Sequence, residues 1–246
     1  MGSLAGQLNT VSSPPVTGPG GGRKPRFLCL HGFRTSGDIM RTQVLGKWPG
    51  LVTARLDLVF ADAPFPAGGG SDVDGIFPPP YYEWYQFDKA EYRNFEECLE
   101  YIEDLIVKYG PFDGVMGFSQ GAILSSVLPG LQEKGLALTK VPKLKYVVII
   151  GGAKSRSSAI AENAYSPKIK CPSLHFLGDM DFLRTQGEAL LEAFIDPIVI
   201  RHPKGHTVPR LDDKSLEIML SYLERIEKDL QKDAVLDEEH KEEYIC

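Results

Sequence analysis

The chain has 246 residues, of which 43% are hydrophobic and 24% charged, and its formal net charge at pH 7 is −6. A chain of this length can bury a large core in one α/β domain, so its stability requires neither disulfides nor a structural metal. The acidic balance excludes the basic patch that nucleic-acid binding needs, and no run approaches the roughly 20 apolar residues of a membrane helix.

The first residues of the chain are mostly Gly, Ser, Pro and Thr. They contain neither the apolar segment of a signal peptide nor the arginines of a transit peptide. We therefore predict a disordered leader over residues 1–23, followed by a folded domain over residues 24–232.

Within that domain, short apolar runs alternate with longer helical patterns, which predicts a mainly parallel sheet flanked by helices. The expected strands are Phe27–Leu30, Leu56–Phe60, Gly114–Met116, Tyr146–Ile150, Leu174–Leu177 and Ile198–Ile200. The expected helices cover about Glu91–Lys108, the run from Ser119 to Pro129-Gly130, and about Leu211–Lys232. Residues 233–246 are expected to form a charged, solvated tail.

The segment 65–92 interrupts this alternation. It contains Gly68-Gly69-Gly70, Pro78-Pro79-Pro80 and a dense group of aromatic residues. A long stretch without regular structure inside a domain is often a lid or a pocket wall, so we predict a lid-like insertion here. Its aromatic side chains are candidates for binding an acyl chain, with ordinary packing onto the body as the equally weighted alternative: Tyr81, Tyr82, Trp84, Tyr85 and Phe87.

The strongest local signal is the pentapeptide Gly117-Phe118-Ser119-Gln120-Gly121, a G-x-S-x-G pattern. An apolar strand precedes it and a helical run follows, which is the setting of a nucleophile elbow. Such a turn lifts the serine hydroxyl clear of the sheet, near the positive end of the helix dipole. The sequence thus predicts Ser119 as a nucleophile.

A serine needs a base to take its proton, and in this arrangement the acid and then the histidine follow the serine along the chain. His206 comes in a loop after the last expected strand and is preferred to His202 at the end of that strand. The orienting acid follows the preceding strand, where position alone does not separate Asp179 from Asp181.

An oxyanion hole requires two N–H groups directed at the developing negative charge. One is expected from Gln120, directly after the nucleophile, and the other from Phe33, in the loop after the first strand. His31 in the same loop is interpreted as structural rather than catalytic.

The four cysteines, Cys29, Cys98, Cys171 and Cys246, are far apart and form no C-x-x-C pair. This spacing predicts neither a disulfide framework nor a zinc site, and it favours a reducing compartment. We expect a cytoplasmic protein, with the nucleus as a second location, that uses no metal and no cofactor. The sequence carries no signal for an oligomeric state.

Taken together, the motifs of this chain resemble the FSH serine hydrolases, a family that includes the ovarian-cancer-associated hydrolase of animals and polyketide-releasing thioesterases of fungi. The resemblance runs from Arg26 to about Leu223, with its motifs in order. They are Cys29-Leu30-His31-Gly32-Phe33, Asp62-Ala63-Pro64, Gly110-Pro111-Phe112-Asp113-Gly114, Gly117-Phe118-Ser119-Gln120-Gly121, Gly178-x-x-Asp181 and Gly205-His206-x-Val208-Pro209.

The resemblance implies an α/β-hydrolase fold with a Pro- and aromatic-rich insertion. It also implies a triad of Ser119, Asp181 rather than Asp179, and His206, with Phe33 and Gln120 as oxyanion donors. The expected function is hydrolysis of a small-molecule ester or thioester. A non-catalytic ligand-binding protein and an acyltransferase are the alternatives.

Overall fold

The computed structural model describes residues 23–88 and 91–243, with side chains as far as residue 236. The predicted leader therefore lies outside the described residues, except for Arg23. In chain order the elements are β1 (Arg26–Leu30), α1 (Gly37–Lys47), α2 (Gly50–Thr53), β2 (Asp57–Ala61), β3 (Phe65–Pro66), β4 (Tyr82–Glu83), β5 (Gln86–Asp88), β6 (Glu91–Arg93), α3 (Phe95–Tyr109), β7 (Gly114–Phe118), α4 (Gln120–Glu133), β8 (Tyr146–Ile150), α5 (Ser158–Tyr165), β9 (Ser173–Gly178), α6 (Arg184–Leu191), β10 (Ile198–His202) and α7 (Asp213–Glu243).

A six-stranded sheet forms the centre of the molecule, in the order β10-β9-β8-β7-β1-β2. Every neighbouring pair is parallel. Strands such as β8 (Tyr-Val-Val-Ile-Ile) are buried along their whole length, as expected for a sheet covered on both faces. The predicted strands and their parallel arrangement are confirmed.

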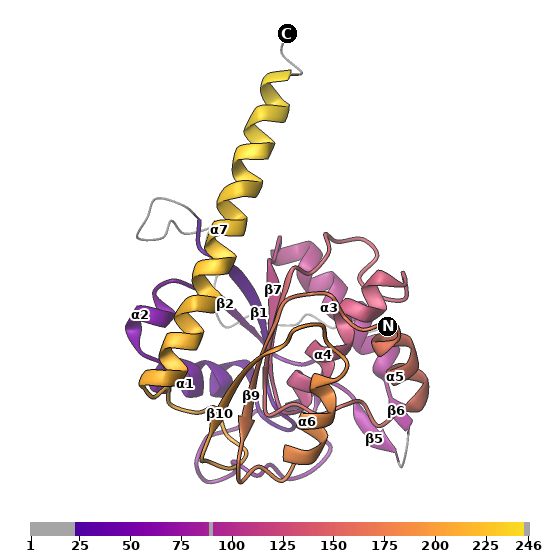
Figure 1. Ribbon diagram of the computed structural model, residues 1–246. Coiled ribbons are helices and arrows are strands. Elements are labelled where there is room, and N and C mark those ends of the chain that lie inside the picture. Colours follow the sequence, from indigo (N-terminus) through magenta and orange to yellow (C-terminus); the bar gives the residue numbers. More distant parts are fainter. Residues whose placement is uncertain (1–22, 89–90, 244–246) are drawn as a thin grey trace.

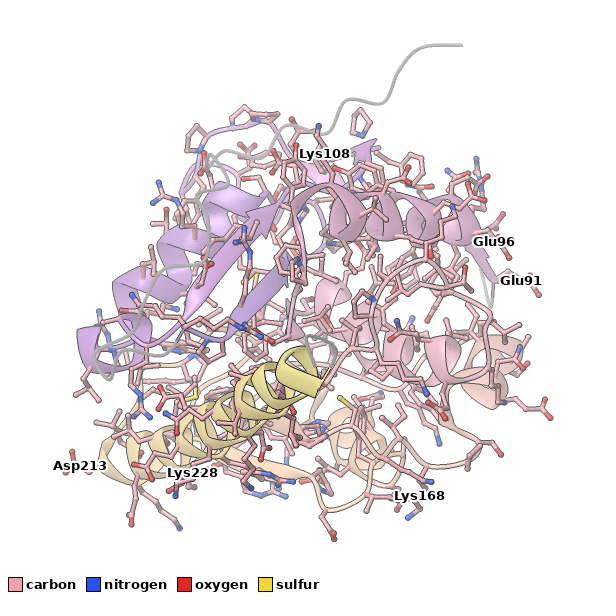
Figure 2. All side chains as sticks on the ribbon, turned by 90° about the horizontal axis from the view of Figure 1, so that it is seen from above. Glu91, Glu96, Lys108, Lys168, Asp213 and Lys228 are labelled. Atoms are coloured by element: carbon pink, nitrogen blue, oxygen red, sulfur yellow. The ribbon has the colours of Figure 1, made fainter. Side chains whose placement is uncertain are left out.

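Two apolar clusters fill the two sides of this sheet. In one, Cys98 of α3 and Leu124 of α4 pack against side chains such as Val115 of β7. In the other, Val44 of α1 and Tyr222 of α7 pack against alternating residues of the same strands. Figure 1 shows the resulting three layers, and Figure 2, from above, shows α3 and α7 on opposite sides of the sheet.

The strand order reverses direction between β1 and β7. From β1 the chain first builds outward to β2, and from β7 it builds the other way to β10. In open parallel sheets, ligands bind at the carboxyl ends of the strands, beside such a switch point. The segments after β1, β7, β9 and β10 all start from this edge and carry Phe33, Ser119, Asp181 and His206.

Helix α3 begins at Phe95, so the predicted start near Glu91 is wrong. Residues 91–93 instead form β6, which pairs antiparallel with β5. Asn94, between β6 and α3, has a left-handed backbone with φ 60°, a conformation that asparagine tolerates better than most residues. The ring of Tyr92 stacks on Tyr85 with 4.5 Å between the centroids, which fixes the hairpin on the body.

Helix α4 continues through Pro129 to Glu133, although we predicted that it stops at Pro129-Gly130. A proline removes one helical N–H, yet tertiary packing can offset that cost. Here Gly130 brings the helix against α5 so closely that a Cβ at this position would lie 1.8 Å from the carbonyl oxygen of Ala164. The helix thus packs against α5 beyond Pro129, and it ends where Gly135, with φ 68°, adopts the left-handed conformation of a C-terminal cap.

Helix α7 runs to Glu243, well beyond the expected end near Lys232. Residues 233–243 contain neither glycine nor proline, and seven of the eleven are Ala, Leu, Glu or Lys, which favour helix. Figure 1 shows this last part projecting from the body. The predicted boundary at residue 233 therefore falls inside a continuous helix.

Candidate active site

Ser119 occupies the sharp turn between β7 and α4, with φ 54° and ψ −116°. A non-glycine residue rarely adopts such angles, and strain of this kind is often found at functional positions. The turn is possible because Gly121 lacks a side chain: a Cβ there would lie 2.0 Å from the carbonyl oxygen of Leu30 in the adjacent strand. The predicted strand–turn–helix geometry around the serine is present.

The hydroxyl of Ser119 faces the imidazole of His206. Oγ of Ser119 lies 2.8 Å from Nε2 of His206, within hydrogen-bonding distance. The other ring nitrogen, Nδ1, lies 2.9 and 3.0 Å from the two carboxylate oxygens of Asp181. The carboxylate is held in place by the N–H of Leu183, which donates to Oδ1 over 2.8 Å. Three residues from separate loops thus form one hydrogen-bonded chain.

The structure distinguishes the two aspartates that were equal candidates, from sequence position alone, for the acid that orients the histidine. Asp181 is buried against His206, whereas Asp179 is exposed. It also separates the histidines. His202 is a buried residue at the end of β10, outside the cavity that contains Ser119, and burial lowers the pKa of its imidazole. His175 is buried within β9, where loss of solvent lowers its pKa to about 3.

Gly151, directly after β8, leaves room for the His206–Asp181 pair. Its φ of 57° lies in the left-handed region that glycine adopts without strain. A Cβ at this position would lie 3.1 Å from Nδ1 of His206 and 3.2 Å from Oδ2 of Asp181. Any larger residue would crowd the contact between base and acid.

The two predicted oxyanion donors, Phe33 and Gln120, line the same cavity as Ser119. The Phe33 loop approaches the nucleophile at Gly32, where a Cβ would lie 3.4 Å from Cβ of Ser119. Gln120 is the first residue of α4, so its N–H has no acceptor within the helix. The N–H of Gln120 therefore lies at the positive end of the α4 dipole, directly after Ser119, and Phe33 belongs to the loop that approaches the nucleophile.

His31 is completely buried, and its ring is used structurally, as predicted. Its Nε2 accepts a hydrogen bond from the N–H of Ala63, so the proton resides on Nδ1, which donates to the carbonyl of Gly32. Burial lowers the pKa of His31 to about 4. A neutral imidazole thus links the Phe33 loop to the segment after β2.

The aromatic residues of the 65–92 insertion do not act together as a pocket wall. Of the five aromatic candidates for acyl binding, only Phe87 lines the cavity that contains Ser119. Trp84 and Tyr85 are fully buried in the core, so the acyl-binding role predicted for them is wrong. Tyr81 and Tyr82 are half-buried but also lie outside the cavity lining.

The buried aromatic pair instead joins the insertion to the predicted oxyanion loops. The indole N–H of Trp84 donates to the carbonyl of His31 over 2.9 Å. The side-chain amide of Gln120 accepts from the N–H of Trp84 and donates to the carbonyl of Tyr85. Short strands β3, β4, β5 and β6 also give the segment regular structure that the sequence did not predict.

The cavity in front of Ser119 has a volume of about 470 Å³. Several residues that line it were not identified from the sequence: Tyr92, Phe118, Ile123, Lys154, Arg156 and Phe182. The ring of Phe182 lies 4.6 Å from that of His206 and is 75% exposed, at the edge of the cavity. Its position directly after Asp181 is the one sequence signal that could have found it.

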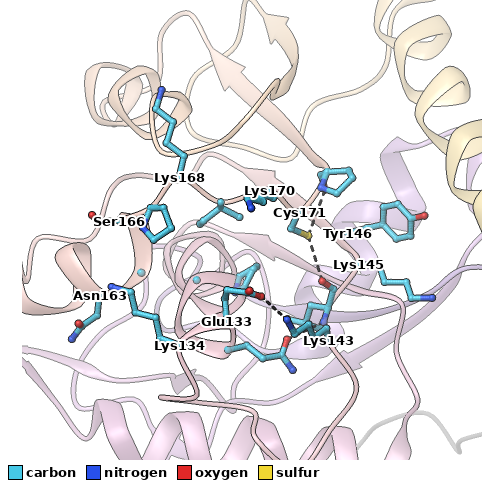
Figure 3. A pocket seen from close by; sticks show the side chains of 18 residues that line it. Glu133, Lys134, Lys143, Lys145, Tyr146, Asn163, Ser166, Lys168, Lys170 and Cys171 are labelled. Carbon is cyan, nitrogen blue, oxygen red and sulfur yellow. Dashed lines mark hydrogen bonds and ion pairs between the residues drawn. The ribbon is translucent and has the colours of Figure 1, made fainter.

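A second cavity of about 410 Å³ lies among α4, α5 and the start of β9, and Figure 3 shows its lining. It is bordered by several lysines, two of which are paired: Lys143 with Glu133 and Lys145 with Asp233. Its one cysteine, Cys171, is not an activated nucleophile, because burial raises its pKa to about 12. Among the described residues that line this second cavity, Cys171 is therefore no candidate for nucleophilic catalysis.

Across the residues that the structure describes, no group of three or more His, Cys, Asp or Glu side chains is placed to hold a metal ion. Within the same residues, no helix combines the length and the apolar character needed to cross a bilayer.

Comparison with known proteins gives consistent results. A family model described as "Serine hydrolase (FSH1)" matches residues 21–218. The human protein named esterase OVCA2 is 31% identical over 211 residues, covering 76% of this chain and 90% of its own. An esterase of Anopheles gambiae is 32% identical over 202 residues, which is 77% of this chain and 73% of that protein.

Solved structures support the same fold at lower identity. The crystal structure of esterase PE8 matches with a TM-score of 0.56 and 22% identity, covering 87% of this chain and 98% of that one. Arabidopsis thaliana SOBER1 matches with a TM-score of 0.52 and 21% identity, over 82% of this chain and 98% of its own. The predicted α/β-hydrolase fold is confirmed.

Proposed function

This chain belongs to the serine hydrolase (FSH1) family and is a carboxylesterase-type hydrolase, and from that premise we propose that it cleaves esters and thioesters through an acyl-enzyme formed on Ser119. The observation that carries this proposal is the hydrogen-bonded chain from Ser119 through His206 to Asp181. A serine hydroxyl is a weak nucleophile, and an adjacent imidazole oriented by a carboxylate is what activates it.

In the first step, Nε2 of His206 takes the proton of Ser119 as Oγ attacks the substrate carbonyl carbon. The carbonyl π electrons move to oxygen, and the N–H groups of Phe33 and Gln120 stabilise that oxyanion. When the tetrahedral intermediate collapses, the bond to the alcohol or thiol breaks. The imidazolium returns its proton to the leaving group, and the acyl group stays on Ser119.

In the second step, water replaces the alcohol. His206 takes a proton from the water as it attacks the acyl carbonyl, and the same N–H groups stabilise the second oxyanion. Collapse releases the carboxylic acid and returns the proton to Oγ of Ser119. Asp181 stabilises the imidazolium in both steps and fixes the tautomer with the proton on Nδ1. Because both substrates present an acyl carbonyl, the same groups serve an ester and a thioester.

The walls of the cavity suit an acyl chain. Phe87, Phe118, Ile123, Phe182 and Leu183 present apolar side chains around the nucleophile. Burial of methylene groups against such a wall contributes about 0.8 kcal/mol per CH₂. Within the described part of the chain, no observation favours a non-catalytic ligand-binding role or acyl transfer to an acceptor other than water.

A cytoplasmic location remains part of this proposal. Cys29 and Cys98 are buried and reduced, and Cys171 is also a free thiol. Free cysteines of this kind are typical of reducing compartments.

The proposal is tested with p-nitrophenyl esters and the matching thioesters of graded chain length, using wild type and Ser119→Ala. We expect both substrate classes to be hydrolysed by wild type and turnover to fall by roughly four to six orders of magnitude in the variant. Hydrolysis by Ser119→Ala at a near-normal rate would contradict the proposal.

A further inference from the structure

Two cationic side chains, Lys154 and Arg156, line the cavity that contains Ser119 and His206. Both belong to the loop between β8 and α5, which starts at the carboxyl edge of the sheet. The proposed hydrolysis does not use either residue, because the triad and the oxyanion donors complete the chemistry. A pair of cations in a pocket with mostly apolar walls therefore needs a separate explanation.

The loop that carries these cations is held in a defined position. The hydroxyl of Tyr92 accepts hydrogen bonds from the N–H of Arg156 over 2.8 Å and from Oγ of Ser155 over 3.3 Å. On the other side, the hydroxyl of Tyr165 accepts the N–H of Ser155. The backbone around Ser155 is thus held in place at the cavity, and the side chains of Lys154 and Arg156 extend from it as exposed cations.

The charges of Lys154 and Arg156 are not neutralised by the protein. In the part of the chain that the structure describes, neither forms an ion pair with a carboxylate; Lys154 contacts only the face of the Tyr165 ring, with Nζ 5.7 Å from its centroid. The cavity lining contains a single carboxylate, Asp72, which comes from the insertion and not from this loop. The lining thus carries an excess of positive charge in a chain whose net charge is −6.

The second cavity provides a contrast within the same molecule. There, Lys143 and Lys145 are paired with Glu133 and Asp233, and Lys134 donates to the carbonyl of Glu162. Figure 3 shows Lys143 directed at Glu133 and Lys145 directed away from Cys171. Lys168 and Lys170 of that cavity also form no ion pair among the described residues, but only Lys154 and Arg156 line the cavity that contains Ser119.

We propose that the substrate carries an anionic group, a carboxylate or a phosphate, which Lys154 and Arg156 bind while the scissile carbonyl lies at Ser119. The proposal rests on the function inferred above and names the substrate class for that site. A planar guanidinium can bind both oxygens of such an anion at once, and a lysine adds a second charge. The anion can belong to the acyl part or to the leaving alcohol, since both lie within the cavity during the reaction.

The acyl arm of the test compares p-nitrophenyl hexanoate with the p-nitrophenyl monoester of adipic acid, which has the same chain length and a terminal carboxylate. The alcohol arm compares phenyl acetate with 4-acetoxybenzoate. The readout in each arm is the ratio of kcat/KM for the anionic ester to that for the neutral ester. Both kcat/KM values are measured on the same protein preparation. A smaller fraction of folded enzyme therefore lowers both values equally and leaves the ratio unchanged.

In at least one arm, we expect wild type to prefer the anionic ester, and this preference to fall roughly tenfold in Lys154→Gln or Arg156→Gln and further in the double variant. Arg156→Lys keeps the charge and should keep most of the preference. Raising the ionic strength should weaken the preference in wild type, because salt screens partly exposed charges. Lys168→Gln, which removes a lysine from the second cavity, is the matched control and should leave the ratio unchanged.

A ratio that is the same in wild type and in the double variant in both arms would overturn the proposal. That outcome is distinguishable from failure of the proposed function. If hydrolysis of the neutral esters still depends on Ser119, only the assignment of the anion is wrong. If Ser119→Ala hydrolyses them normally, the proposed function itself fails.

Discussion

Nε2 of His206 lies 2.8 Å from Oγ of Ser119, although 87 positions separate the two residues along the chain. The contact exists because β7 and β10 end at the same edge of one parallel sheet, so the loops that follow them meet there. The same arrangement brings Asp181 to the other side of the imidazole after β9. A fold whose strands point in one direction therefore assembles the site from distant segments.

The contact between Asp181 and His206 predicts different effects for two neighbouring aspartates. Asp181→Asn should lower kcat by about 10⁴-fold, because an asparagine can no longer stabilise the imidazolium or fix its tautomer. Asp179→Asn is the matched control, and we expect a change of less than about tenfold because its side chain is exposed. Steady-state kinetics on one ester measure both. If Asp179→Asn were the more damaged variant, the assignment of the acid would be reversed.

A partly buried ion pair supports the proposed oxyanion loop. Nε of Arg34 donates to Oε1 of Glu83 over 2.7 Å, and Glu83 is only 1% exposed. The same oxygen accepts the N–H of Gly68 in the insertion. Because Arg34 directly follows Phe33, loss of the pair should shift the Phe33 N–H. Glu83→Gln should therefore lower kcat roughly tenfold and change KM less. This loss of kcat is smaller than the one expected when a whole oxyanion donor is removed.

The control for this prediction is Glu133→Gln, which removes an equally short but exposed ion pair with Lys143. An exposed pair contributes little, so its kinetics should match wild type. If Glu83→Gln folds poorly, Arg34→Lys preserves the charge while losing the Nε donor and tests the same positioning. Equal kcat values for these variants and the control would show that the pair has no influence on the loop.

Packing between α4 and α5 gives a prediction about stability. Gly130→Ala would place a Cβ 1.8 Å from the carbonyl oxygen of Ala164, so the helices must separate. We expect the free energy of unfolding to fall by about 1–3 kcal/mol, measured by urea denaturation. Gly46→Ala in α1 meets no atom within 4 Å and should be neutral or stabilising by up to about 1 kcal/mol. A stable Gly130→Ala variant would contradict the close approach of the two helices.

Buried neutral histidines predict a loss of stability in mild acid. Burial lowers the pKa of His31 to about 4 and of His175 to about 3, while an unfolded histidine titrates near 6.5. The unfolded state therefore binds more protons below about pH 6.5. The stability of the folded state is fully present above that pH and falls as the pH decreases towards 4, by an amount on the order of a few kcal/mol per histidine.

Urea denaturation at a series of pH values between 7.5 and 4.5 measures this loss. His175→Gln removes one titrating group away from Ser119, so its stability should decrease less steeply with falling pH than that of wild type. Identical pH dependence in the two proteins would mean that His175 is protonated in the folded state as readily as in the unfolded chain.

The features predicted well from the sequence are those that depend on neighbouring residues. Continuous apolar runs such as β8 predicted the parallel strands, and the pentapeptide around Ser119 predicted the sharp turn that holds the serine. The order of strands then required His206 to follow the last one. These patterns are local, or follow from topology rules that hold across parallel sheets.

The features that the sequence did not predict depend on contacts between distant residues. Trp84 is an aromatic residue in an irregular segment, and only its hydrogen bond to the carbonyl of His31 shows that it packs inward. In the same way, α4 passes Pro129 because of its contact with α5. Asp179 and Asp181 differ in role only through the turn that buries one of them. The cations Lys154 and Arg156 occupy a loop whose place at the cavity is set by Tyr92 and Tyr165.

Covalent labelling by a fluorophosphonate probe, with the modified peptide identified by mass spectrometry, tests the central claim most directly. Ser125→Ala is the matched control, because this buried serine lies in α4, the helix that follows Ser119, and its hydroxyl has no hydrogen-bond partner among the described residues. We predict a single adduct on Ser119 in wild type and in Ser125→Ala, and none in Ser119→Ala. Labelling that persists in Ser119→Ala, or an adduct on another residue of the wild-type protein, would contradict the account.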